Sequence, residues 1–97
     1  DLEEMLQLAE PETNQLAYSL LWRGIEYHTL PQCVAHSVDV LPYSPLAQGL
    51  LTGKYRSADE VPVGRARTKH FSGERDEARH ERVGEESVTF ETIDRIR

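Results

Sequence analysis

The chain has 97 residues, of which 38% are hydrophobic and 29% are charged, and its formal net charge is -6. These values suit one small globular domain, and the acidic balance argues against a nucleic-acid partner. No apolar run approaches the roughly 20 residues of a membrane helix, so we expect no membrane partner. The single cysteine cannot form an internal disulfide and no signal peptide is visible, which favours a cytoplasmic location.

The first elements expected are a helix over residues 1–10 and a short strand over residues 13–18. Apolar residues recur at helical spacing from Leu2 to Ala9, and Pro11 stops the helix. In the strand, Gln15 is expected on one face, with its two neighbours on the other. The chain starts without methionine, and its first residues already belong to the expected helix. We therefore expect that the chain begins in the middle of a fold.

The next elements expected are a helix over residues 30–36 and a strand over residues 38–43. Pro31 suits the first turn of this helix, and Cys33 is expected on its buried face as inert packing. A strand, a helix and a strand in this order predict a βαβ unit with parallel pairing.

The second half is expected to be a long polar loop followed by a helix. Residues 57–83 read as the loop, with short helical turns, and residues 84–97 as the helix. Its expected buried stripe is Phe90, Ile93 and Ile96, with Arg95 and Arg97 near its C-terminus. The mixed-charge residues 76–86 are interpreted as solvated. The domain organisation expected is thus 1–56 as a core with a ligand loop, 57–83 as a loop and 84–97 as a helix.

Residues 41–55, Leu-Pro-Tyr-Ser-Pro-Leu-Ala-Gln-Gly-Leu-Leu-Thr-Gly-Lys-Tyr, are the most informative stretch. A strand ending in a loop of proline and glycine is where α/β proteins place ligands. Gly49 and Gly53 allow a close backbone approach, free N–H groups in such a loop suit phosphate oxygens, and Lys54 adds a positive charge.

This stretch resembles the cofactor loop after the seventh strand of the aldo-keto reductases, and Asn14-Gln15-Leu16-Ala17-Tyr18-Ser19-Leu20-Leu21 resembles their sixth strand. The resemblance implies an α/β fold: part of a (β/α)8 TIM barrel, about its sixth and seventh βα units. Two parallel strands and three helices cannot close a barrel, which takes roughly 250 residues. The partner expected is therefore the rest of the barrel, or a second copy that supplies strand neighbours.

The resemblance also implies an NADP(H) site. Gln15 would hold the nicotinamide carboxamide, Tyr43 would stack on the ring, and Arg65 would fold over the cofactor. The residues implied at the pyrophosphate are Ser44, Pro45, Leu46, Gln48, Gly49 and Lys54.

No catalytic residue is assigned, because the family's Asp, Tyr, Lys and His come from the first half of the barrel. The function expected is hydride transfer between the nicotinamide and a small aldehyde, ketone or alcohol by the parent enzyme, with the chain alone inactive. No metal is expected, since the four histidines share no ligand spacing. Two alternatives stay open: a non-catalytic relative of the same fold with a cofactor-binding or a structural or regulatory role, and a small α/β domain unrelated to redox chemistry.

Overall fold

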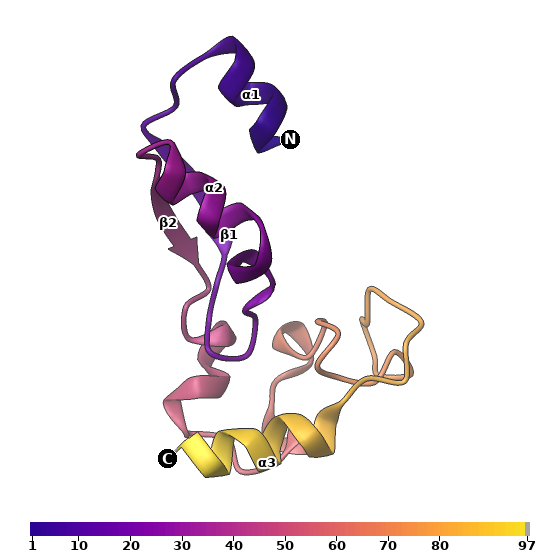
Figure 1. The fold of residues 1–97 in the computed structure, drawn as a ribbon. Coiled ribbons are helices and arrows are strands. Elements are labelled where there is room, and N and C mark those ends of the chain that lie inside the picture. The colour runs from indigo at the N-terminus through magenta and orange to yellow at the C-terminus, as the bar shows by residue number, and fades with distance from the viewer. Residues whose placement is uncertain (97) are drawn as a thin grey trace. The chain divides into compact units, whose positions relative to one another are not determined.

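The computed structural model describes residues 1–96, so the role expected of Arg97 at a helix end lies outside the described residues. The chain divides into two compact units, one of residues 1–47 and one that begins at residue 48. Figure 1 labels the helices and strands of both units. Among residues 1–96, no helix is both long and apolar enough to cross a bilayer.

The first unit opens with α1 (Leu2–Leu8), which confirms the first expected helix. Asp1 is its N-cap: the carboxylate of Asp1 accepts a hydrogen bond from the Glu4 backbone N–H at 3.0 Å. The Glu4 carboxylate in turn accepts from the terminal amine at 2.8 Å, which completes a capping box. The backbone is already extended at Ala9, before Pro11, so the helix is shorter than expected.

A βαβ unit follows and confirms the expected topology. β1 (Thr13–Ala17) and β2 (Asp39–Tyr43) pair in parallel, with Gln15 opposite Leu41 and Ala17 opposite Tyr43. The 3-10 helix η1 (Gly24–Tyr27) and α2 (Thr29–Ala35) connect them. Each strand lies within one residue of its expected bounds at either end. The fold of this unit is therefore α/β with two parallel strands.

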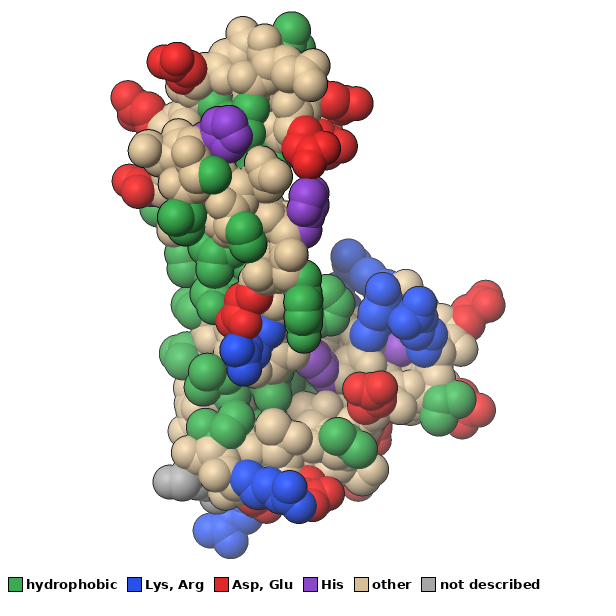
Figure 2. Space-filling view, viewed as in Figure 1, with side chains coloured by type: hydrophobic (Ala, Val, Ile, Leu, Met, Phe, Trp, Pro, Cys, Tyr) green, Lys and Arg blue, Asp and Glu red, His purple; other side chains and the backbone are tan. Residues whose placement is uncertain are grey.

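Helix α2 covers one face of the strand pair (Figure 1). Cys33 of α2 is fully buried, as expected, and its sulfur lies 3.9 Å from the Asn14 amide nitrogen on β1. Val38 is buried where the chain enters β2. Many large hydrophobic side chains of this unit are exposed instead, and Figure 2 shows hydrophobic side chains at the surface of the face it draws. Those of the first unit include Leu20, Trp22, Tyr27, Val34, Leu41, Tyr43 and Leu46.

The second unit has its own core around α3 (Glu86–Ile96). Short 3-10 helices, η3 (Ala58–Glu60) and η4 (Val63–Arg65), confirm the helical turns expected in residues 57–83. This segment is nevertheless more than a polar loop, because four of its apolar side chains are buried. The core residues of the unit are Leu50, Ala58, Val61, Ala66, Phe71, Thr89 and Ile93.

The buried stripe of α3 differs in part from the expected one. Ile93 is buried as expected, but Phe90 is only half-buried and Ile96 is 47% exposed. Thr89, four residues before Ile93, is buried instead. The buried face of α3 is therefore formed by Thr89 and Ile93 rather than by the three expected residues. The helix begins at Glu86 rather than residue 84, because Gly84 has a left-handed backbone with φ of 79°.

Glu86 joins the long segment to α3. Its carboxylate accepts hydrogen bonds from the Ser72 backbone N–H at 2.8 Å and from the Arg75 guanidinium. The same guanidinium donates to Asp59 at 3.0 Å. The interpretation of residues 76–86 as solvated is therefore wrong for Glu86, since a carboxylate with these partners is held in place.

Candidate functional site

Gln15 and Tyr43 project from the same face of the two-stranded sheet. Gln15 lies opposite Leu41 in the parallel register, and Tyr43 stands two residues beyond Leu41 on the same strand. Because side chains alternate between the faces of a strand, all three share one face. Asn14, which contacts α2, lies on the other face. Gln15 and Tyr43 are thus exposed on the face that α2 leaves bare.

The backbone turns sharply after Tyr43. Ser44 has a positive φ of 54°, and its carbonyl accepts a hydrogen bond from the Ala47 N–H at 2.8 Å. Three successive residues, Ala47, Gln48 and Gly49, then have φ of 48°, 56° and 99°. Non-glycine residues rarely adopt this conformation, and such strain concentrates at ligand sites. The side chains of Ser44, Pro45 and Leu46 are exposed along this turn.

Two cationic side chains of the second unit converge on Gly49. A Cβ atom placed on Gly49 would lie 3.3 Å from Lys54 Nζ and 3.7 Å from Arg65 Nη1. The Thr52 hydroxyl donates to the Gly49 carbonyl at 2.6 Å and accepts from the Lys54 N–H at 3.4 Å, which closes the loop. A glycine backbone beside a lysine and an arginine is an arrangement that suits an anion with several oxygens.

Tyr55 contacts both cations of this group. Lys54 Nζ lies 4.9 Å from the centre of its ring, and Arg65 Nη1 donates to its hydroxyl at 3.4 Å. Burial alone would raise the pKa of Tyr55, but the hydrogen bonds and positive charges of Lys54 and Arg65 outweigh it and lower the pKa. Sequence reasoning did not single out Tyr55, although an aromatic residue directly after a loop lysine is a readable signal.

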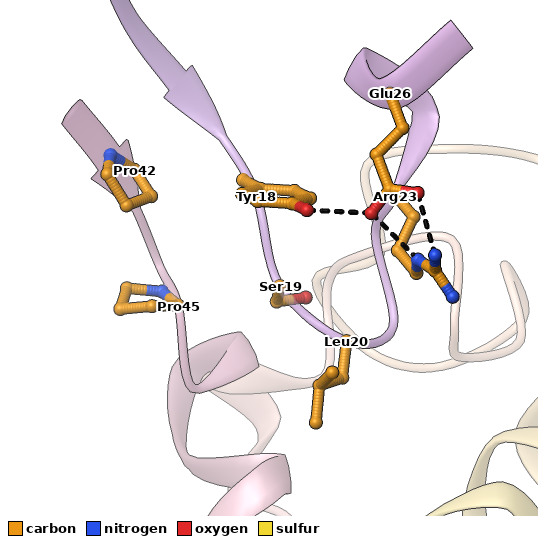
Figure 3. A pocket seen from close by; sticks show the side chains of 7 residues that line it. All are labelled: Tyr18, Ser19, Leu20, Arg23, Glu26, Pro42 and Pro45. Atoms are coloured by element: carbon orange, nitrogen blue, oxygen red, sulfur yellow. Dashed lines mark hydrogen bonds and ion pairs between the residues drawn. The ribbon is translucent and has the colours of Figure 1, made fainter. Parts of the chain in front are cut away.

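A cleft of about 480 Å³ lies in the first unit, at the carboxyl ends of the parallel strands. In Figure 3, Pro42 and Pro45 lie on one side, and Tyr18, Glu26 and Arg23 on the other. Ser19 and Leu20 complete the lining. Of the predicted site residues, Pro45 lines this cleft and the others do not.

The polar wall of the cleft is a fixed group of three side chains. The Arg23 guanidinium donates twice to Glu26, at 2.9 and 2.7 Å, and the Tyr18 hydroxyl donates to the same carboxylate at 2.6 Å. These bonds, that from Arg23 first, lower the pKa of Glu26 to about 2. The bond to Glu26 also raises the pKa of Tyr18. Opposite charges three residues apart on a helical turn are the signal that could have identified this pair.

The predicted cofactor residues fall into two groups. Gln15, Tyr43, Ser44, Pro45 and Leu46 belong to the first unit, and Gln48, Gly49, Lys54 and Arg65 belong to the second. The first group lies on the bare sheet face and on the turn that follows it. In the second group, Lys54 and Arg65 converge on Gly49. No cluster of three metal-ligating side chains occurs among residues 1–96.

Comparison with known proteins identifies the family of the chain. The model of the aldo/keto reductase family matches residues 1–93. The NADH-specific methylglyoxal reductase of Escherichia coli (strain K12) is 44% identical over 63 residues, which are 65% of this chain and 19% of that protein. The methylglyoxal reductase YeaE of the same organism is 47% identical over 51 residues, which are 50% of this chain and 18% of that protein.

The chain thus spans less than a fifth of the length of these two relatives. No solved structure matches it. A family match over residues 1–93 covers nearly the whole sequence, including the strand pair and both groups of predicted cofactor residues. The chain belongs to the aldo/keto reductase family.

Proposed function

We propose that residues 1–97 form part of the cofactor side of an aldo/keto reductase barrel, and that the parent enzyme reduces small carbonyl compounds with a nicotinamide dinucleotide. The observation that carries this proposal is the convergence of Lys54 and Arg65 on Gly49. The two parallel strands would be the sixth and seventh of the barrel, and their bare face would look into it.

The residues of the second unit fit a pyrophosphate. Lys54 and Arg65 supply two positive charges, and Gly49 has no side chain to fill the space beside them. Phosphate oxygens bind well to backbone N–H groups and cations in such loops. In this proposal Lys54 neutralises charge and Arg65 holds the phosphate by its planar group, with Gln48 and Ser44 to Leu46 along the same loop.

The residues of the first unit fit the nicotinamide end. Gln15 has an amide that pairs with a carboxamide, donor to acceptor and acceptor to donor. Tyr43 is 51% exposed and offers a flat face for an aromatic ring. Their common, uncovered sheet face supports a joint role, in which Gln15 orients the ring and Tyr43 shields one side of it from water.

A nicotinamide held by these residues would supply the hydride that reduces the carbonyl carbon, and the carbonyl oxygen would take a proton to give an alcohol. The residues of this chain bind and orient, and the proton donor belongs to another part of the parent enzyme. The names of both relatives favour methylglyoxal, a 2-oxoaldehyde, as the first substrate to test.

The cofactor expected from the sequence is NADP(H), and this choice stays a prediction. One relative is named NADH-specific, so NADH must be tested beside NADPH. A cytoplasmic location belongs to the same proposal and is supported by Cys33, which is free and buried. The rest of the barrel, or self-association of the chain, would cover the bare sheet face.

The proposal is tested by fluorescence titration of NADPH and of NADH into the parent enzyme. We expect Lys54→Ala and Arg65→Ala to weaken binding, and the loss to shrink at high salt, because the screening length of exposed charges falls to about 3 Å at 1 M salt. Matched controls are Lys69→Ala and Arg79→Ala, which remove the same charges at exposed positions.

Unchanged binding in both Lys54→Ala and Arg65→Ala would contradict the cofactor assignment. Cofactor binding by the parent enzyme without reduction of methylglyoxal or other small carbonyl compounds would instead favour the non-catalytic alternative. The two outcomes are separate, because one measures affinity and the other turnover.

A further inference from the structure

Tyr55 contacts both of the cations that converge on Gly49. Its ring is 4.9 Å from Lys54 Nζ, and its hydroxyl accepts a hydrogen bond from Arg65 Nη1 at 3.4 Å. Both cations also lower the pKa of the hydroxyl, so Arg65 contacts the hydroxyl and Lys54 acts on both the ring and the hydroxyl.

Two like charges beside one glycine repel each other, so another group must attract both of them to keep them there. A cation over an aromatic face is attracted by the electrons of the ring, and a phenol oxygen accepts from a guanidinium. Long, exposed lysine and arginine side chains otherwise lose much rotamer entropy when a ligand fixes them. A side chain that holds both cations in advance reduces this loss.

We propose that Tyr55 is a positioning residue for the phosphate-binding group, and that its ring and its hydroxyl together hold Lys54 and Arg65 so that both cations face Gly49. This inference rests on the proposed function, because it assumes that the group binds the pyrophosphate of the cofactor. Tyr55 itself acts through the two cations. Its lowered pKa agrees with this arrangement, since positive neighbours stabilise the phenolate.

Two substitutions of Tyr55 distinguish the contribution of its hydroxyl from that of its ring. Tyr55→Phe keeps the ring and removes the hydroxyl, whereas Tyr55→Leu removes both. In the parent enzyme we expect Tyr55→Phe to raise the Kd for NADPH or NADH about twofold to fivefold, the scale of one exposed polar contact. We expect Tyr55→Leu to raise it by a further factor of about two to five, the scale of an exposed cation–π contact. Tyr27→Phe, at a strongly exposed tyrosine of the first unit, is the matched control.

Double-mutant cycles distinguish positioning from mere stability. The effect of Tyr55→Phe is expected to shrink when Arg65 is already alanine, and the additional effect of Tyr55→Leu is expected to vanish when Lys54 is already alanine. A purely structural role would persist in those backgrounds. Inorganic pyrophosphate as a competitor of the cofactor should show the same pattern, since it probes this group without the nicotinamide. In turnover, the cofactor KM should rise while kcat stays unchanged.

The outcomes separate this inference from the proposed function. If Lys54→Ala and Arg65→Ala weaken binding but neither Tyr55 variant does, the positioning role is wrong and the cofactor site stands. Additive effects in both cycles would also overturn it. If Lys54→Ala and Arg65→Ala leave binding unchanged, both the proposed function and the role of Tyr55 fail.

Discussion

Arg75 and Glu86 are eleven residues apart and form an ion pair that joins the long segment of the second unit to α3. The side chains are 25% and 28% exposed, so water screens them less than a surface pair. Glu86 also accepts from the Ser72 N–H, and Arg75 lies over the buried Phe71 ring, 5.9 Å from its centre. The pair therefore holds this segment to the helix.

Glu86→Gln should lower the free energy of unfolding by about 1–3 kcal/mol, because it weakens hydrogen bonds to a charged group that is partly buried. Denaturant unfolding of the parent enzyme measures this loss. Glu91→Gln is the control, because it makes the same change on the same helix, where the pair with Arg95 is exposed. That surface pair should contribute well under 1 kcal/mol. Equal losses in both variants would contradict the role of Glu86.

Gly84→Ala should destabilise the second unit by more than about 1 kcal/mol. Gly84 has a φ of 79°, and a Cβ atom there would overlap the Phe71 carbonyl. Gly24→Ala is the control, since no heavy atom lies within 4 Å of the site of its Cβ. Thermal unfolding of both variants makes the comparison. A Gly84→Ala protein as stable as the parent would show that the Phe71 carbonyl leaves room for a Cβ atom on residue 84, which would contradict this prediction.

Glu26 should titrate with a pKa of about 2, against 4.5 for a free carboxylate, because Arg23 and Tyr18 bond its charged form. A lowered pKa in the folded state means that this stabilisation is fully present above about pH 4.5. It is lost as the pH falls through the folded value near 2. A carboxylate NMR titration of the parent enzyme measures it. Arg23→Gln should move the pKa back toward 4.5, and a pKa unaffected by this change would refute the assignment.

Tyr43→Ala should weaken cofactor binding tenfold to a hundredfold, or about 1–3 kcal/mol, on the scale of base stacking on aromatic residues. Its loss should depend little on salt, in contrast to Lys54→Ala. Titration of the parent enzyme at low and high salt separates the two. Tyr27→Ala is the control at an exposed tyrosine. If Tyr43→Ala binds the cofactor as tightly as the parent enzyme, the exposed ring is not a stacking surface.

The isolated chain should associate with itself at micromolar concentration. Its two strands leave one face bare, with Leu41 and Tyr43 exposed on it, and both edges open. Light scattering measures the mass of the particles. The same purified chain should not oxidise NADPH in the presence of an aldehyde, since in the proposed function the proton donor comes from another part of the parent enzyme. A compact monomer, or steady turnover, would contradict these expectations.

The βαβ unit could be predicted because its signals are local. Alternation and apolar runs marked both strands, Pro31 marked the start of α2, and the parallel pairing followed from the order of elements. The register that puts Gln15 and Tyr43 on one face does not follow from this period, which fixes only the faces within each strand, and it is known from the structure. The prolines and glycines of residues 41–55 correctly predicted a turn after β2, and the cofactor role of this loop stays a prediction.

The second unit was harder to predict because its order comes from contacts across many residues. Ala58, Val61, Ala66 and Phe71 stand in a polar stretch with no helical or strand period, so nothing local marks them as core. Glu86 was interpreted as solvated with the rest of residues 76–86, but its partners are Arg75 and Ser72. The role inferred for Tyr55 likewise depends on Arg65, ten residues away.

The left-handed backbone at Ala47 and Gln48 restricts how this loop can evolve. Each residue carries a Cβ in a conformation that costs roughly 1–2 kcal/mol relative to glycine, so valine, isoleucine and threonine are strongly disfavoured at both positions. Glycine would be accepted there and would relieve the cost, but it would also loosen the loop before folding. Drift at these positions is therefore confined to small or unbranched side chains, and the loop keeps its shape at the expense of stability.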